Sequence, residues 1–266
     1  MTDQLFDEQV LPMEDLEKIG LAKNGRLILS EEDLKALLSG RRTDMLRLEN
    51  LISEGIHILA MDAKLSLKQN EAGHLDLLIH PIYREAEYPK YLTDSEAEAL
   101  EKGELVNIKK VLSDTDGKET DILIEFDKDT NEFIITDTEK ILVPDFVNNE
   151  KLTLEQKESY RKGKEVELKD GTKFQYSGTN RQGISANKLA LVASILIDGG
   201  VSYLLFKGLN ALYGEKKEDE NRKHYGKGYH QALKDMQAEG KEKGQKMEFQ
   251  QKNEYSRGYS RSGMKR

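Results

Sequence analysis

The sequence predicts an α+β protein assembled from small units in which a short helix precedes a β-hairpin. A capped-helix pattern recurs along the chain, alternating apolar and polar residues follow it, and Asp-Gly pairs at 116–117 and 170–171 are typical of tight hairpin turns. The length of 266 residues suits two or three small domains. The chain contains no cysteine, which excludes disulfides, thiolate metal sites and cysteine nucleophiles.

Residues 13–88 are expected to form an N-terminal α+β domain after a disordered start at residues 1–12. Leucine and isoleucine recur at helical spacing through residues 13–51, and this pattern predicts helices. From residue 55 to 83 the apolar period changes to two, with a turn at 70–73, which predicts a hairpin packed on the helices. The acidic start lacks the basic and apolar regions of a signal peptide, so we expect a cytoplasmic protein.

Two helix–hairpin units are predicted at residues 92–148 and 152–185. Each opens on a threonine with Glu or Gln three residues later, a capping box that satisfies two backbone donors at a helix start. Each helix ends on a glycine, which takes the left-handed conformation without steric cost. The residues are Thr93, Glu96 and Gly103, then Thr153, Gln156 and Gly163, and a looser copy has Ser30, Asp33 and Gly40. Coincidence is the alternative, because capped helices that end in glycine are common.

Residues 187–213 contain an apolar segment, Leu189 to Phe206, that we predict to be helical. Its length lies at the lower limit for a membrane span. Asp198, near the centre, opposes insertion, and the two glycines after it would loosen a helix. A membrane anchor, a buried core helix and two short helices hinged at Asp198 therefore all stay open. An Asp198 inside a membrane would need a partner, so the anchor interpretation also predicts a homo-oligomer.

Charge is unevenly distributed: the net charge is −8, but residues 214–266 contain 14 Lys and Arg against nine Asp and Glu. This basic tail is predicted to be helical or disordered. Its end interleaves aromatic and cationic side chains, which suits stacking on unpaired bases while the cations contact phosphates. The candidate nucleic-acid contacts are Tyr255, Arg257, Tyr259 and Arg261. A disordered tail without a ligand is the alternative.

The sequence contains no motif of a known catalytic site, whether a phosphate-binding glycine loop, a nucleophile elbow, a zinc-protease motif or a dinucleotide fingerprint. His74, Asp76 and His80 share one face of a predicted strand, but the histidines are roughly 20 Å apart along it, too far to share a metal ion. Residues 127–131 resemble the start of a calcium loop but lack its later ligands, so we interpret them as a turn. We therefore predict no enzyme, no cofactor and no metal.

The residues from Leu16 to Ile82 resemble one family of domains of unknown function, above all at 16–21 and 37–43. The two capped-helix units resemble a second such family that often follows the first. Together the resemblances cover about residues 10–185. They imply a protein carried on conjugative and other mobile elements of gut anaerobic bacteria, where some relatives are fused to DNA-processing domains. They imply no reaction, ligand or catalytic residue.

Three functions are therefore expectations. The first is a non-enzymatic accessory or scaffold protein of a mobile element, which acts through protein–protein contacts in the cytoplasm or on the inner membrane, tethered by residues 187–213. The second is an accessory protein that binds single-stranded nucleic acid with its tail. The third is an enzyme whose site is assembled from scattered carboxylates.

Overall fold

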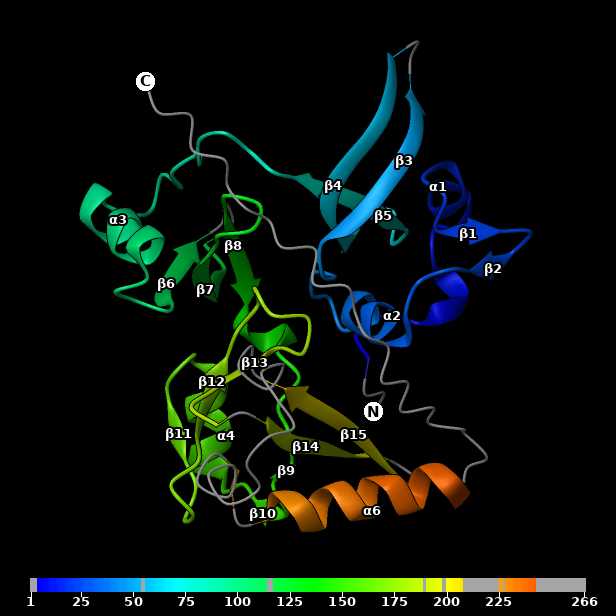
Figure 1. Cartoon of the computed structure of the whole chain (residues 1–266). Helices are drawn as coiled ribbons and strands as arrows, with labels where there is room; N and C mark the ends of the chain where they lie inside the picture. Colours follow the sequence, from blue (N-terminus) through cyan, green and yellow to red (C-terminus); the bar gives the residue numbers. More distant parts are fainter. Residues whose placement is uncertain are drawn as a thin grey trace, which may run out of the picture.

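Helices and antiparallel sheets alternate along the chain, which confirms the predicted α+β class (Figure 1). The computed structural model describes residues 4–53, 56–113, 117–188, 190–197, 200–207, 225–226 and 228–242. Three times along the chain, a helix is followed by a three-stranded antiparallel sheet whose strands are neighbours in sequence order. We refer to residues 31–81, 94–137 and 154–186 as the first, second and third units.

Each unit is a helix with a β-meander. The first contains α2 (Glu31–Leu38), β3 (Leu46–Ser53), β4 (Ile56–Gln69) and β5 (Leu75–Pro81). The second contains α3 (Asp94–Lys102), β6 (Ile108–Ser113), β7 (Glu119–Asp127) and β8 (Glu132–Asp137). The third contains α4 (Leu154–Arg161), β11 (Val166–Glu167), β12 (Lys173–Tyr176) and β13 (Ile184–Ala186). Every strand pairing within a unit joins consecutive strands, so each sheet forms from local hairpins.

The predicted helix caps are confirmed. Thr93 with Glu96, and Thr153 with Gln156, form complete capping boxes, in which each side chain bonds the backbone of the other residue. Ser30 accepts a hydrogen bond from the third backbone N–H of its helix. Left-handed glycines follow the three helices at Gly40, Gly103 and Gly163. Short-range chemistry alone therefore places both ends of these helices.

The N-terminal residues extend the first unit, and two predictions made for this region are wrong. Residues 1–12 were expected to be disordered, but the described residues 4–12 include η1 (Glu8–Val10) and a buried Leu11. Residues 45–51 were predicted helical, but residues 46–51 form part of β3, because their leucines pair across to β4. The remaining elements are α1 (Met13–Lys18), β1 (Ala22–Lys23) and β2 (Arg26–Leu27), and they share one apolar core with α2, β3 and β4.

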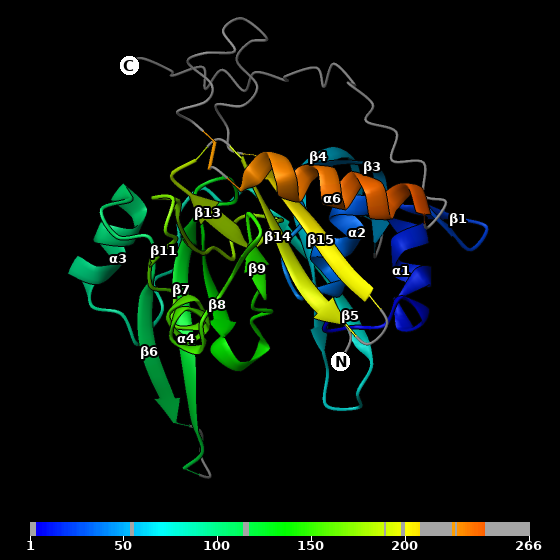
Figure 2. The ribbon, with the colours of Figure 1, turned by 90° about the horizontal axis from the view of Figure 1, so that it is seen from below.

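The predicted apolar helix at 187–213 is wrong, because its described part is a β-hairpin. Strands β14 (Ala190–Ile197) and β15 (Gly200–Lys207) pair in antiparallel register and join β9 (Phe146–Val147) and β10 (Glu150–Lys151) in a four-stranded sheet. One face packs on the core of the third unit and the other on α6 (Tyr229–Glu242), as Figure 2 shows. Strands that are buried on both faces are continuously apolar, so their sequence resembles that of a buried helix.

Some predicted features lie outside the described residues. These are Leu189 and Asp198 in the apolar segment and Tyr255, Arg257, Tyr259 and Arg261 in the tail. Phe206 is described, and it is a buried core residue. Within the part of the chain that the structure describes, no helix combines the length and the apolar character needed to cross a membrane. Helix α6 is the described part of the tail, and it packs through Tyr229, Ala232 and Met236.

Candidate functional site

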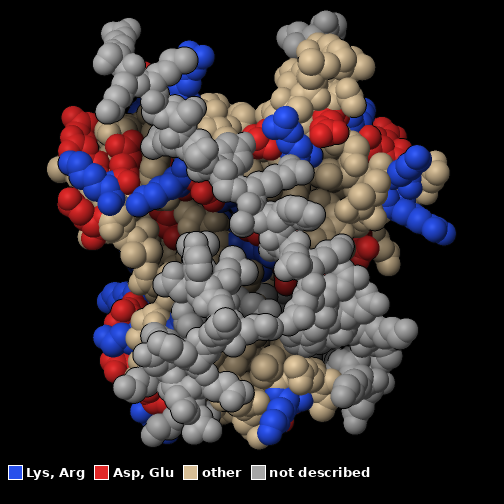
Figure 3. All heavy atoms as spheres, viewed as in Figure 1, with Lys and Arg blue, Asp and Glu red and all other residues tan. Residues whose placement is uncertain are grey.

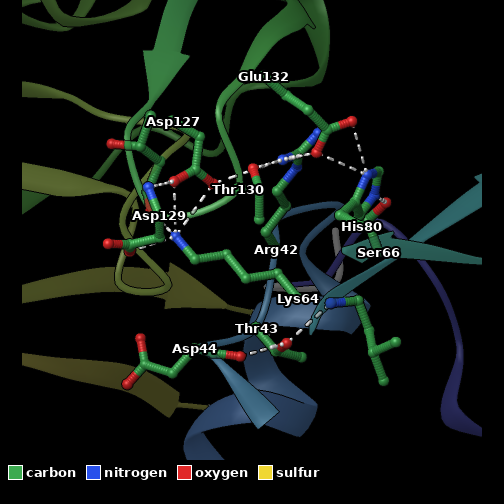
Figure 4. Close-up of polar contacts among 12 residues, drawn as sticks. Arg42, Thr43, Asp44, Lys64, Ser66, His80, Asp127, Asp129, Thr130 and Glu132 are labelled. Carbon is green, nitrogen blue, oxygen red and sulfur yellow. Dashed lines mark hydrogen bonds and ion pairs between the residues drawn. The ribbon is translucent and has the colours of Figure 1, made fainter. Parts of the chain in front are cut away.

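Basic side chains of the first unit meet acidic side chains of the second at a buried junction (Figure 4). Arg42 comes from the extended segment after α2, and Lys64 comes from the middle of β4. Asp127 is the last residue of β7, and Glu132 is the first residue of β8. We call this set of contacts the ionic junction.

Lys64 is the most deeply buried cation of the ionic junction. Its Nζ lies 2.9 and 3.0 Å from the two carboxylate oxygens of Asp127 and 2.8 Å from Oδ2 of Asp129. Only 3% of the Lys64 surface and 1% of the Asp127 surface is exposed. Removing either charge from water is costly, so each of the two side chains depends on the other for its place in the interior.

Arg42 adds a second cation with a different set of partners. Its guanidinium donates hydrogen bonds to Glu132 Oε2 at 2.9 Å, to Thr130 Oγ1 at 3.0 Å and, more weakly, to Asp127 Oδ2 at 3.4 Å. Burial acts to raise the pKa of Glu132, but the hydrogen bond from His80 and the charge of Arg42 outweigh it and hold this pKa below its ordinary value. The carboxylate is therefore charged and engaged at neutral pH.

His80 extends the ionic junction to a hydroxyl on the neighbouring strand. Its Nε2 lies 2.8 Å from Ser66 Oγ, and its Nδ1 lies 3.4 Å from Glu132 Oε2. The order of hydroxyl, imidazole and carboxylate is that of a hydrolase triad, which also needs oxyanion donors and a substrate cavity beside the nucleophile. The 260 Å³ cavity beside the junction is not lined by Ser66 or His80. We interpret His80 as a residue that positions Glu132 toward Arg42.

The third unit is joined to the other two by further polar contacts. Arg181 pairs with Glu32, Asp33 and Asp44 of the first unit, with the Asp44 carboxylate 2.9 Å from its guanidinium. The backbone N–H of Gly178 donates to the carboxylate of Glu125, which lies on β7 and is 2% exposed. A side chain at Gly178 would lie within 2.9 Å of this carboxylate, so glycine permits the close approach.

Glu125 differs from the other acids of this region because no cation of the described residues pairs with it. Burial raises its pKa to about 7, the hydrogen bonds from Gly178 and Ser177 act to lower it, and the nearby charge of Asp127 raises it further. A buried carboxyl without a cation favours the protonated form. The contact between the second and third units therefore contains a group that titrates near neutral pH.

No pattern in the sequence indicates the ionic junction, although the sequence analysis names His80 and residues 127–131. The predicted turn at 127–131 is confirmed by the left-handed Asn131 and its backbone bond to Asp127. In the described residues, no group of three or more His, Asp or Glu side chains is arranged to hold a metal ion. The available signal was Lys64, a charged residue inside an apolar strand.

Residues 6–91 match the family model described as a protein of unknown function, DUF4099. No curated protein and no solved structure matches the chain. The matched range covers the N-terminal elements and the first unit, and it ends before Thr93, the N-cap of α3. The basic half of the ionic junction therefore lies inside the matched domain, and the acidic half lies in the chain that follows it.

We predict that Lys64→Met lowers the free energy of unfolding by about 3–5 kcal/mol, because it leaves the buried Asp127 carboxylate without its main counter-charge. The matched control is Arg47→Met, which breaks the exposed pair with Asp62 and should cost about 1 kcal/mol or less. Urea unfolding measures both. Adding Asp127→Leu to Lys64→Met should recover part of the loss, and equal losses in Lys64→Met and Arg47→Met would show that the junction is not a major source of stability.

Glu125 should make stability depend on pH. The folded protein holds a proton on this carboxyl from about pH 4.5, its ordinary pKa, up to about pH 7, whereas the unfolded chain releases it. Stability from this group is therefore greatest below pH 4.5 and falls by about 3 kcal/mol as the pH rises to 7. Glu125→Gln should remove this fall in urea unfolding, whereas Glu119→Gln, at an exposed site, should keep it. A wild-type pH profile in Glu125→Gln contradicts the assignment.

Proposed function

We propose that the protein is a non-enzymatic accessory or scaffold protein of a mobile genetic element and that it acts through protein–protein contacts. The mobile-element context comes from the resemblance of residues 10–185 to domains found on such elements. Two observations support the proposal. A projecting strand pair exposes apolar side chains, which favours contact with another protein. The buried carboxylates between the units already bind donors of this chain, which favours a structural role for them over a catalytic one.

The projecting strand pair consists of β3 and residues 56–62 of β4, and we call it the ribbon. β5 pairs with β4 only from Ala63 onward, so the ribbon residues of β4 pair with β3 alone. The base of the ribbon packs in the apolar core of the first unit, whereas its far end extends away from the rest of the molecule (Figure 1) and is almost free of charged atoms in Figure 3. Ile52 and Leu59 are each 73% exposed, and Ile58 is 41% exposed.

The ribbon suits insertion into an apolar groove of a different protein. Ile52 and Leu59 lie on one face of the ribbon and Ile58 on the other, because side chains alternate along a strand. Two aliphatic side chains on a face are too few for the roughly 800 Å² that each partner buries in a standard interface, so a symmetric pairing of two ribbons would be weak. They match a small anchor cluster, which gains most of its binding energy in a pocket that excludes water. We therefore take the partner to be a protein with a complementary apolar groove.

The ionic junction fixes the direction of the ribbon. β4 is one continuous strand of 14 residues that carries Leu59 in the ribbon and Lys64 in the junction. A two-stranded ribbon is only marginally stable alone. Here its base is held by β5 and by the ion pairs to the second unit, so a partner would meet an ordered surface and would lose less conformational entropy on binding.

A photo-reactive side chain at position 59 should crosslink one partner protein in cells that carry the element, and the same group at Glu119, an exposed position on β7, should not. Ile52→Ser should abolish the crosslink, because it removes a neighbouring anchor, and should lower the transfer frequency of the element with little change in thermal stability. Equal labelling at the two positions, an adduct only with a second copy, or a turnover activity in the first 185 residues would contradict the proposal.

A second proposal is that the tail binds single-stranded nucleic acid, and its support is charge. Residues 243–266 contain seven Lys and Arg against two Asp and Glu in a chain with a net charge of −8. Truncation after Glu242 keeps α6, and it should abolish a salt-sensitive increase in the anisotropy of a labelled oligonucleotide. Unchanged binding after truncation contradicts this proposal. The membrane anchor predicted at 187–213 required an apolar helix, and the described part of this segment is instead the β14–β15 hairpin.

A further inference from the structure

A cavity of about 70 Å³ lies between the first unit, the third unit and the β14–β15 hairpin. Its walls are mainly apolar or aromatic, with Tyr160 from α4, Tyr176 from β12, Ala193 from β14 and Pro144 from the segment before β9. Arg41, which follows the left-handed Gly40, also lines this cavity. Lys35, which pairs with Glu31, lines the cavity as well. The space therefore combines hydrophobic walls with two cations, and the charge of Lys35 is already paired within the chain.

Arg41 lacks the counter-charge that the other arginines of the interior have. Its Nε donates to the backbone oxygen of Arg181 at 2.9 Å, and no carboxylate in the described part of the chain forms an ion pair with it. Arg42 and Arg181, by comparison, have two and three acidic partners. Burial lowers the pKa of Arg41, and the neighbouring Tyr176 and Tyr160 oppose this only in part.

A cation without an ion-pair partner against apolar walls favours an anionic ligand. Partly buried charges are normally paired, and the planar guanidinium fits a carboxylate best, through two parallel hydrogen bonds. An apolar cavity of about 150 Å³ holds one benzene molecule, so this smaller space accommodates a carboxylate group and only a few further atoms. Ser39 and Gln182 also line the cavity and supply polar groups at its edge.

We propose that this cavity binds the carboxylate of a small organic acid and that Arg41 provides the counter-charge. The carboxylate belongs either to a free short-chain acid or to the C-terminal residue of a partner peptide, and both present the same group to Arg41. The cavity is separate from the ribbon, so this proposal does not depend on whether the ribbon binds a protein.

Binding can be measured on the full chain by heteronuclear NMR, with the Arg41 Nε–H signal as a direct probe and the ionic strength held constant. Propionate should give saturable shifts of this signal, and propionamide, a neutral molecule of nearly the same shape, should bind about tenfold more weakly or not at all. Acetyl-alanine and its amide form the second pair. Tighter binding of acetyl-alanine than of propionate indicates a peptide C-terminus, and the reverse order indicates a free acid.

Two variants make the test specific to the cavity. Arg41→Gln removes the charge, and Ile195→Phe narrows the space while Arg41 stays. Each should weaken propionate binding about tenfold or more, read from backbone signals around Ala193, whereas Arg26→Gln on exposed β2 should leave it unchanged. The proposal is overturned if propionate and propionamide shift the signals equally, if the shifts do not saturate, or if Ile195→Phe binds propionate as the wild type does.

Discussion

The burial of Lys64 against Asp127 is the constraint on which the arrangement of the units depends. An ion pair in the interior costs desolvation energy on both sides, and the cost is recovered only when several donors and acceptors meet in good geometry. The structure meets this condition by placing Asp129, Thr130 and Arg42 around the pair. Because the cations come from one unit and the anions from the next, the two units can be correctly packed only in one relative position.

This constraint joins the matched residues 6–91 to the chain that follows them. Removing the chain after residue 91 would leave Lys64 and Arg42 facing solvent or an apolar surface without their carboxylates. Lys64 lies in the middle of β4, and the residues that β4 contributes to the ribbon lie toward its start. A strand that is anchored in one half and free in the other can present side chains in a fixed direction, and this supports the proposed scaffold role.

Features that depend on residues close in sequence were predicted correctly, whereas features that depend on contacts between distant residues were not. The caps at Thr93 and Thr153 and the hairpins after them were predictable, because a capping box and a hairpin are decided by residues close in sequence. The segment 190–207 was misassigned, since an apolar run fits a buried helix and a strand covered on both faces equally well. The ionic junction joins Lys64 to Asp127 across 63 positions, and no local pattern specifies such a pairing.

Arg41 and Arg42 are neighbours in the sequence but have different interaction partners. Both follow α2, and both are cations turned toward the interior. Arg42 reaches the second unit and binds two carboxylates, whereas Arg41 reaches the third unit and finds a backbone oxygen and tyrosine rings. If position 41 had only a structural role, a neutral side chain would give a more stable fold, since a guanidinium without a counter-charge destabilises the site that holds it. An arginine at this position fits the proposed carboxylate ligand, which arrives from outside the chain.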